Sequence, residues 1–352
     1  MPNPLPIRRL YRFDREKRPS NFHGLRYAYL PLLLLVGCQS PSFSQQPIWE
    51  PESRPVERIS QGAGEGPAWH PEKGILFSGE GSILIWKHDQ KVQALVKDGG
   101  TNGLLFDHEG RLLTCEPLNR RVRRLESDGS WTTLTSDYNG LAYNTPNDIT
   151  VDAAGNIFFS DPRYGDRDSM EMRDDSGRAI EGVYCIRPNG TVDRVITHEV
   201  DRPNGVLVSA DDSFLYVADN NNNQSDGARK LWRFDKEADG SLDISSQKLI
   251  FNWKTSRGPD GMTQDALGRI YVAAGVNRNK LPYETRLPYP AGIFVFSPSG
   301  EWLGHLPIPH DEVTNCAFGG PDLRTLYITA GGHLWTIRTA YAGAIPWPAP
   351  SP

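Results

Sequence analysis

Six short segments of this sequence begin with an oxygen-bearing side chain, and these side chains are the ones that could bind a cation. Each segment continues with alternating apolar residues, a polar turn and a second apolar run. The six opening residues, spaced 37 to 57 residues apart, are Glu65, Asn102, Asn147, Asn204, Asp260 and Asn315. Carboxylate and amide oxygens are the ligands that Ca²⁺ prefers, whereas a structural zinc site needs His or Cys. A fold that gathers these residues would form a site for a hard divalent cation.

The same residue types also form ordinary turns, which is the alternative explanation of the pattern. Asn-Gly and Asp-Gly pairs are common in tight turns. Glu65 does not favour turns, and Pro67 stiffens the segment that follows it. We therefore favour the cation site.

Short strands must position the opening residues. After most copies of the pattern two more strand-like runs follow, and no stretch shows a sustained helical period. Six units of four strands predict an all-β fold, a six-bladed β-propeller with four-stranded antiparallel blades around a central channel. The first strand of each blade lines the channel, so we expect the openers to meet at one mouth. Residues 55–59 are expected to supply the outer strand of the last blade.

The second strand of each blade returns toward the same mouth and ends, in three copies, at an acidic residue. These residues are Glu116, Asp161 and Asp219. They could bind a second cation, support the first set of ligands or cap turns, and we favour the last two roles together. The charged loop after Asp161 and the loop of residues 275–291 are expected to overhang the mouth as lids.

Composition restricts the classes of partner. The chain has 352 residues, with 38 basic and 43 acidic side chains, and from residue 38 onward the counts are 31 and 41. Nucleic-acid phosphates need a basic face, so we expect no nucleic-acid partner. No apolar run approaches the roughly 18–20 residues that span a bilayer as a helix, which excludes a polytopic membrane protein.

The N-terminal segment is typical of an export signal. A basic stretch precedes a short apolar run that ends in Leu35-Val36-Gly37-Cys38, which resembles a bacterial lipobox. We predict that residues 1–37 are a signal peptide, that Cys38 is lipidated, and that residues 38–54 form a polar tether. Gln39 favours the periplasmic face of the outer membrane, so the expected location is the cell envelope. The alternative is a buried apolar segment with an ordinary cysteine.

Several motifs resemble, in their order and spacing, the gluconolactonase/regucalcin family, also called the senescence-marker-protein-like lactonases. The motifs are Glu65-Gly66-Pro67, Pro146-Asn147-Asp148, Phe159-Ser160-Asp161-Pro162-Arg163-Tyr164-Gly165, Arg202-Pro203-Asn204-Gly205, Pro259-Asp260-Gly261-Met262 and Phe318-Gly319-Gly320-Pro321-Asp322. The resemblance runs over residues 55–339, and residues 340–352 form a Pro-rich tail.

The resemblance implies a propeller with one divalent metal ion at the channel mouth. The metal ligands that it implies are Glu65, Asn147, Asn204 and Asp260, with Asp260 also the catalytic acid/base. Ca²⁺ is the ion that we favour, with Zn²⁺, Mn²⁺ and Mg²⁺ as alternatives. The candidate substrate-binding residues are Asn102, Asp161, Arg163 and Tyr164. The family's Arg two residues before the Asn-Asp pair is replaced by Thr145, which leaves the identity of the lactone open.

The chemistry that this set suggests is hydrolysis of a lactone. A bound cation would polarise the carbonyl and stabilise the oxyanion, and Asp260 would activate a water molecule. One alternative is an arylesterase or phosphotriesterase that uses the same metal site. Another is a non-catalytic surface propeller that binds a ligand.

The sequence offers no rival nucleophile in a GxSxG elbow. His310 and His333 flank the last blade, and a His-assisted, paraoxonase-like mechanism becomes possible if they reach the mouth. Cys115, Cys185 and Cys316 match no zinc or redox motif, and we expect them to be small buried side chains.

Overall fold

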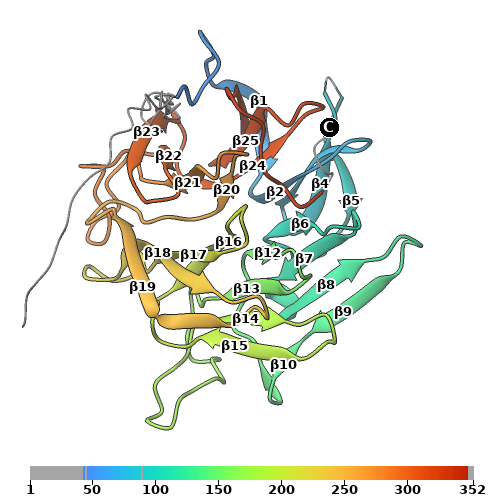
Figure 1. Cartoon of the computed structure of the whole chain (residues 1–352), viewed down its shortest axis with the longest axis vertical. Coiled ribbons are helices and arrows are strands. Elements are labelled where there is room, and N and C mark those ends of the chain that lie inside the picture. The colour runs from blue at the N-terminus through green and yellow to red at the C-terminus, as the bar shows by residue number, and fades with distance from the viewer. Residues whose placement is uncertain (1–42, 44–45, 89, 348–352) are drawn as a thin grey trace, which may run out of the picture. The chain divides into compact units, whose positions relative to one another are not determined.

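Six four-stranded antiparallel sheets form the blades of a β-propeller (Figure 1). The structure is a computed structural model and describes residue 43 and residues 46–88 and 90–347. Cys38 and the expected signal peptide lie outside the described residues. Within the described residues the regular structure is almost entirely strand, with one short 3₁₀ helix, η2 (Pro117–Asn119). The fold class predicted from the sequence is confirmed.

The first three blades follow one another along the chain, each running from its inner to its outer strand. Blade 1 contains β2 (Glu65–His70), β3 (Gly74–Gly79), β4 (Ser82–Trp86) and β5 (Gln93–Val96). Blade 2 contains β6 (Leu104–Phe106), β7 (Leu112–Glu116), β8 (Arg121–Leu125) and β9 (Trp131–Thr135). Blade 3 contains β12 (Ile149–Val151), β13 (Ile157–Asp161), β14 (Gly182–Ile186) and β15 (Val192–Ile196). A hairpin of β10 (Asp137–Tyr138) and β11 (Leu141–Ala142) separates blades 2 and 3.

The last three blades repeat this order, except that the final one takes its outer strand from the start of the domain. Blade 4 contains β16 (Pro203–Val208), β17 (Phe214–Asn220), β18 (Arg229–Lys236) and β19 (Leu242–Asn252). Blade 5 contains β20 (Met262–Gln264), β21 (Ile270–Ala274), β22 (Gly292–Phe296) and β23 (Trp302–Pro307). Blade 6 contains β24 (Val313–Gly319), β25 (Thr325–Ala330), β26 (Gly332–Arg338) and β1 (Val56–Ala63).

The strand β1 closes the ring. It pairs antiparallel with β26, from Val56 opposite Thr336 to Ala63 opposite Gly332. The closure expected from residues 55–59 is confirmed, and the strand continues to residue 63. The two ends of the propeller are therefore held together by backbone hydrogen bonds rather than by a disulfide. The cysteines among the described residues, Cys115, Cys185 and Cys316, are buried and free.

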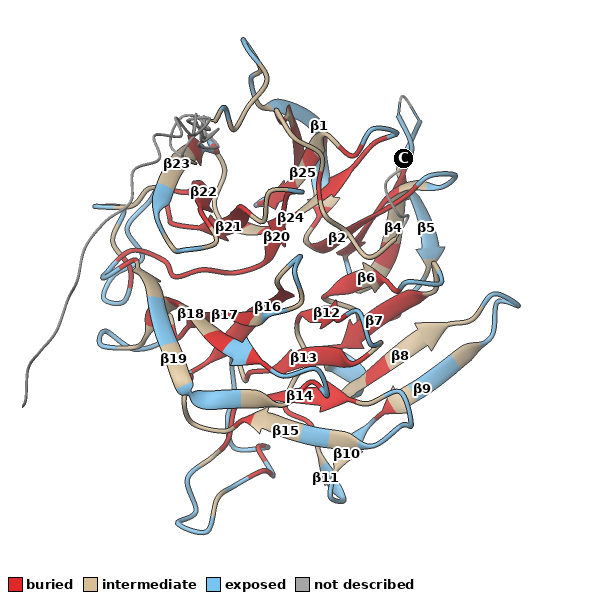
Figure 2. Cartoon of the chain, viewed as in Figure 1, coloured by how far each residue is buried: buried red, intermediate tan, exposed pale blue. Residues whose placement is uncertain are grey.

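The hydrophobic core lies between the blades. Six clusters of buried side chains occur, one at each junction of neighbouring blades. The inner and second strands are the most deeply buried, as in β12 and β13, while outer strands such as β5 and β15 are partly exposed (Figure 2). Burial of apolar surface contributes about 25 cal/mol per Å², so each blade depends on its neighbours for stability.

Segments on either side of the strands also pack on the propeller. Ile48 and Trp49 contact the cluster between blades 5 and 6, and Trp49 bridges to Thr339. The Ala344 N–H donates to the Gln264 carbonyl at 2.9 Å, and the Trp347 ring lies 4.9 Å from the His70 ring. The described parts of the expected tether and tail therefore add contacts to the fold.

At several junctions between blades, neighbouring inner strands approach one another without room for a Cβ atom. A Cβ added to Gly205, which follows the opener of blade 4, would lie 2.1 Å from the Asp260 carbonyl oxygen. One added to Gly103, which follows the opener of blade 2, would lie 2.6 Å from the Asn147 carbonyl oxygen. Glycine is needed where two backbones come this close. The residue after an opener is thus packed against the next opener around the ring.

The close approach predicts that a single methyl group at position 205 disrupts the ring. Gly205→Ala should destabilise the domain by about 3 kcal/mol, the upper end of what overpacking usually costs, because the facing atoms are backbone. Urea unfolding followed by intrinsic fluorescence measures the change. The matched control is Gly99→Ala, whose Cβ would meet its nearest neighbour at 3.4 Å. Equal free energies of unfolding for the two variants would contradict the packing constraint.

Candidate active site

The opening residues occupy equivalent positions before or within the inner strands and surround the channel. Glu65 begins β2, Asn204 lies in β16, and Asp260 lies two residues before β20. Asn204 and Asp260 are buried, with 4% and 3% of their surfaces exposed, whereas Glu65 and Asn147 are partly exposed. The Gly103 N–H donates to the Asn147 carbonyl at 2.8 Å, so a backbone hydrogen bond links the residue after one opener to the next opener.

Three carboxylates interact electrostatically within this ring. Burial, followed by the charges of Asp260 and Asp148, holds the pKa of Glu65 well above its usual range. Burial raises the pKa of Asp148 to about 7, although its carboxylate accepts the Val206 N–H at 3.2 Å. Burial also raises the pKa of Asp260 to about 6. Carboxylates gathered in this way favour a cation between them.

The positive charge nearest to these carboxylates belongs to Arg257, a residue that the sequence analysis did not single out. Its guanidinium Nη2 lies 3.4 Å from Asp260 Oδ2 and 2.7 Å from Glu312 Oε2, and its Nη1 lies 3.4 Å from Glu284 Oε1. The Arg257 charge lowers the pKa of Asp260 against the larger effect of burial. Arg257 therefore limits the rise, and the pKa of Asp260 still lies above its usual range.

The amide of Asn204 is oriented by hydrogen bonds. Its Nδ2 donates to the Tyr164 hydroxyl at 3.0 Å, and that hydroxyl donates to the Asn220 carbonyl at 3.1 Å. With its nitrogen engaged, Asn204 keeps its side-chain oxygen for a ligand. Tyr164, expected to bind substrate, thus supports a residue of the ring.

The other amides of the ring divide into two kinds. The side chains of Asn102 and Asn147 form no hydrogen bond with another described residue, and both are partly exposed. The Asn315 Oδ1 accepts the N–H of Cys316 at 2.8 Å, and its amide lowers the pKa of Asp148. Asn102 and Asn147 are therefore free to bind a ligand, whereas Asn315 serves the protein itself.

The donor set fits a hard divalent cation. Glu65 and Asp260 supply two carboxylates, and Asn147 and Asn204 supply amide oxygens, so all donors are oxygen atoms, as Ca²⁺ requires. The two carboxylates would neutralise the charge of the ion, and a bound cation would favour their ionised forms against the effect of burial. These four residues are the ones that would hold the cation.

The acids at the ends of the second strands hold loops at the mouth. The two Asp161 carboxylate oxygens accept the N–H groups of Asn144 and Thr145, both at 2.8 Å. Asp219 accepts the Arg202 N–H at 2.9 Å, and Glu116 is fully buried in ion pairs with arginines of β8. Asp161 and Asp219 thus accept backbone N–H groups of the segments that lead to the next openers, whereas Glu116 pairs with side chains. Asp161 fixes the segment that leads to Asn147.

Arg163 is engaged by the loop that contains it. Its backbone N–H donates to Glu181 Oε2 at 2.7 Å, and its guanidinium donates to the Asp166 carbonyl and the Ser169 hydroxyl. These bonds shape the loop beside Tyr164. Among the described residues, the guanidinium has no contact with an opener.

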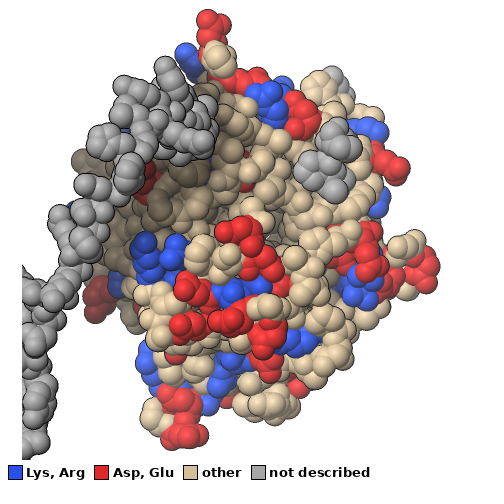
Figure 3. Space-filling model, in the orientation of Figure 1, with Lys and Arg blue, Asp and Glu red and all other residues tan. Residues whose placement is uncertain are grey.

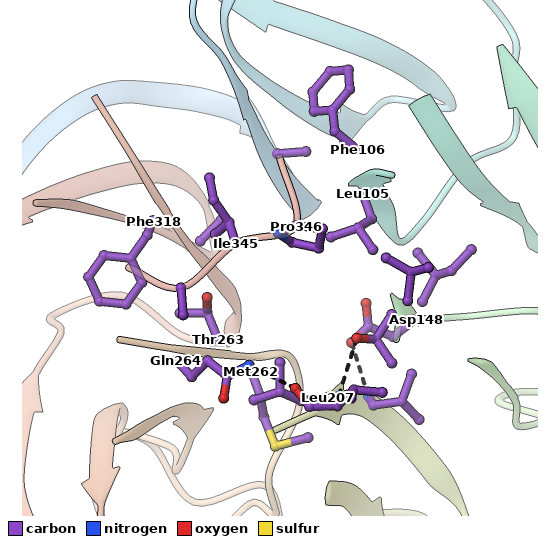
Figure 4. A pocket seen from close by; sticks show the side chains of 18 of the residues that line it. Leu105, Phe106, Asp148, Leu207, Met262, Thr263, Gln264, Phe318, Ile345 and Pro346 are labelled. Atoms are coloured by element: carbon purple, nitrogen blue, oxygen red, sulfur yellow. Dashed lines mark hydrogen bonds between the residues drawn. The ribbon is translucent and has the colours of Figure 1, made fainter. Parts of the chain in front are cut away.

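The channel behind the ring is apolar. A cavity of about 350 Å³ is lined by residues of all the inner strands and by the tail residues Ile345, Pro346 and Trp347 (Figure 4). Asp148 lies in its wall, but the four ligand candidates do not. The polar ring and the apolar cavity therefore lie at different depths along the channel.

On the face seen in Figure 3, basic and acidic side chains are interspersed.

Two residues near the ring were missed by sequence reasoning. Asp148 stands where four of the other copies have glycine directly after the opener, and a comparison of the copies could have singled it out. Arg257 carries no such signal, because its contacts with Glu284 and Glu312 join loops distant in sequence.

Comparison with known proteins identifies the family. The SMP-30/gluconolactonase/LRE-like region model matches residues 63–332, so the chain belongs to this family. It is 26% identical to a gluconolactonase of Zymomonas mobilis, over 83% of each chain. It is also 26% identical to the pentonolactonase XacC of Haloferax volcanii, over 76% of this chain and 81% of that protein.

Solved structures agree with this placement. A gluconolactonase of Xanthomonas campestris superimposes with a TM-score of 0.67 and 28% identity, covering 84% of this chain and 95% of that one. The family expected from the sequence motifs is confirmed.

No helix among the described residues is long and apolar enough to cross a membrane.

The position of Arg257 predicts a metal-dependent effect on stability. Arg257→Gln should lower Tm strongly in EDTA, because removing one partner of a buried ion pair costs about 3–5 kcal/mol. Saturating Ca²⁺ should restore part of the loss by supplying positive charge. Thermal unfolding with EDTA and with Ca²⁺ measures both effects.

The control for this prediction is Arg124→Gln, which removes a more exposed ion pair with Glu126 at 2.8 Å. Such a pair contributes little, so Tm should change only slightly. An unchanged Tm of Arg257→Gln in EDTA would contradict the assignment.

Proposed function

We propose that this protein is a divalent-metal-dependent hydrolase that opens a lactone, either a sugar lactone or a related cyclic ester. The observation that carries the proposal is the oxygen-lined ring of Glu65, Asn147, Asn204 and Asp260, in which buried carboxylates lie within electrostatic range of one another. Relatives named gluconolactonase and pentonolactonase support lactones as the substrate class.

The metal would supply Lewis-acid chemistry, polarising the lactone carbonyl and stabilising the negative charge that develops on its oxygen. We favour Ca²⁺ because every donor is an oxygen atom. Glu65 would contribute charge to its site. Asn147 and Asn204 would contribute neutral oxygens, with Asn204 oriented by Tyr164.

Asp260 is the base in the proposed reaction. Its carboxylate takes a proton from a water molecule, whose oxygen adds to the carbonyl carbon. The ring C–O bond then breaks, and the proton passes to the leaving alkoxide, giving a hydroxy acid. Arg257 lies 3.4 Å from the Asp260 carboxylate and favours its ionised form. Asn102, whose side-chain amide makes no hydrogen bond with a described residue, would contact the substrate.

The proposal predicts different losses for the two carboxylates. Asp260→Asn keeps an oxygen donor but removes the base, so kcat at saturating metal should fall by about 10²–10⁴-fold. Glu65→Gln should weaken Ca²⁺ binding by roughly 1,000-fold, because one unit charge at about 4 Å is worth about 4 kcal/mol at an effective dielectric constant of 20, and each 1.4 kcal/mol is about tenfold in affinity. Calorimetry and turnover of a panel of sugar and aliphatic lactones measure these changes.

The control is Glu237→Gln, an exposed carboxylate in the turn after β18, which should change neither quantity. Full turnover by metal-saturated Asp260→Asn would show that Asp260 is only a ligand. Hydrolysis of aryl esters or phosphotriesters without any lactone would replace the proposed substrate class. Metal binding with no turnover on the whole panel would favour a ligand-binding propeller.

We also propose that the protein is exported and anchored by lipid at Cys38, in the outer membrane with the propeller in the periplasm. The support is the Leu35-Val36-Gly37-Cys38 sequence after a short apolar run. Cys38→Ser should move the protein from the membrane to the soluble fraction on cell fractionation. Retention of the variant in the membrane fraction would refute lipid anchoring.

A further inference from the structure

A cluster of two histidines and a glutamate lies in blade 6, and none of its members is a residue of the proposed oxygen-lined ring. Glu57 comes from the closing strand β1, His333 from β26, and His310 from the connection between β23 and β24. One possible ligand atom from each residue lies within 4.8 Å of the other two. The two imidazole rings are stacked, with centroids 3.6 Å apart and planes inclined by 15°. Three segments distant in sequence thus bring together side chains that bind metals.

The histidine nitrogens in this cluster have no hydrogen-bond partner. Nδ1 of His310 and Nδ1 of His333 are both buried and make no hydrogen bond with a described residue. The nearest charged atom to His333 Nδ1 is Glu57 Oε1, at 3.4 Å. Burying a polar atom without a partner costs about 1–3 kcal/mol. Ring stacking does not satisfy the nitrogen lone pairs, so the arrangement calls for a ligand.

The cluster is nevertheless accessible to a small ion. The His333 side chain is 20% exposed and the Glu57 side chain 36% exposed. The Trp335 ring, 5.5 Å from that of His310, gives the site an apolar wall. An ion can therefore enter from solvent and be held against a partly dehydrated surface.

We propose that Glu57, His310 and His333 form a second metal site, which binds Zn²⁺ or another transition-metal ion that prefers imidazole. Two imidazoles and one carboxylate with an open position are a donor set that zinc accepts, and soft or borderline ions favour imidazole where Ca²⁺ favours oxygen. Zinc–nitrogen bonds of about 2.0–2.1 Å place neighbouring tetrahedral ligands roughly 3.4 Å apart. The two stacked imidazole rings would have to tilt apart to reach that geometry, because nearly parallel rings do not direct their nitrogen lone pairs at one point.

This site would fasten the closure of the propeller. An ion held by Glu57 and His333 would join β1 to β26 through side chains as well as through the backbone ladder. His310 would add the 308–312 connection, whose Glu312 forms an ion pair with Arg257. The inference concerns stability and metal content, and it does not depend on the proposed lactonase activity.

The test uses the full chain saturated with Ca²⁺, so that the oxygen ring is occupied before Zn²⁺ is added. Calorimetric titration should show one equivalent of Zn²⁺ bound, and Tm should rise with it. His310→Gln, His333→Gln and Glu57→Gln should each lose this equivalent and the rise in Tm. His198→Gln, which removes a histidine paired with Asp174 at 2.8 Å, is the matched control and should keep both.

Chemical modification of the unmutated protein covers the case in which a histidine variant fails to fold. With Zn²⁺ at ten times its Kd, diethyl pyrocarbonate should modify His310 and His333 about tenfold more slowly, because the free fraction of the site falls by that factor. Ca²⁺ alone should give no protection. Mass spectrometry of the peptides reads out each histidine.

The outcomes distinguish Zn²⁺ binding at the histidine site from Zn²⁺ binding at the oxygen-lined ring. Retention of the Zn²⁺ equivalent in Glu65→Gln and Asp260→Asn supports the histidine site, whatever those variants do to turnover. Loss of the equivalent in these two variants, with retention in His310→Gln and His333→Gln, would overturn it. Absence of both Zn²⁺ binding and histidine protection in the unmutated protein would also overturn it.

Discussion

The close approach of the inner strands around the channel is the constraint on which the site depends. The glycine after the opener in blade 4 faces the Asp260 backbone at a distance that admits no side chain. Because the strands meet this closely, side chains that open them are forced toward one axis. In blade 3 the equivalent position carries Asp148, whose carboxylate uses the available space to accept the Val206 N–H. Backbone packing therefore determines where the oxygen-bearing opening residues lie.

This packing brings the carboxylates of Glu65, Asp148 and Asp260 together where contact with solvent is limited. Burial and mutual repulsion raise the pKa of Glu65, and burial raises the pKa of Asp260 to about 6. Arg257, 3.4 Å from Asp260, offsets part of this charge. Strained or repulsive groups persist where the surrounding structure determines their position and function uses them. A divalent cation would relieve the repulsion, so binding energy and propeller stability are coupled at this ring.

The sequence predicted the parts of the fold that local pattern controls. Short alternating runs and their repetition predict the blades, and the strand-like segment beginning at Val56 predicts the closing strand. The opener positions follow from the repeat itself, as do the caps at Asp161 and Asp219. What could not be predicted depends on contacts between distant loops. Arg257 reaches Glu284 and Glu312, and His310 stacks on His333, only because the chain returns to the mouth from several blades. Tyr164 supports Asn204 for the same reason.

The central claim is that Glu65, Asn147, Asn204 and Asp260 together hold one divalent cation at the channel mouth. Anomalous diffraction from crystals grown with Mn²⁺ tests this claim most directly, because it locates the ion without reference to activity. The account predicts one strong peak within bonding distance of an oxygen atom from each of these four residues. A map with no peak between them, from crystals that bind Mn²⁺ elsewhere on the protein, would contradict it.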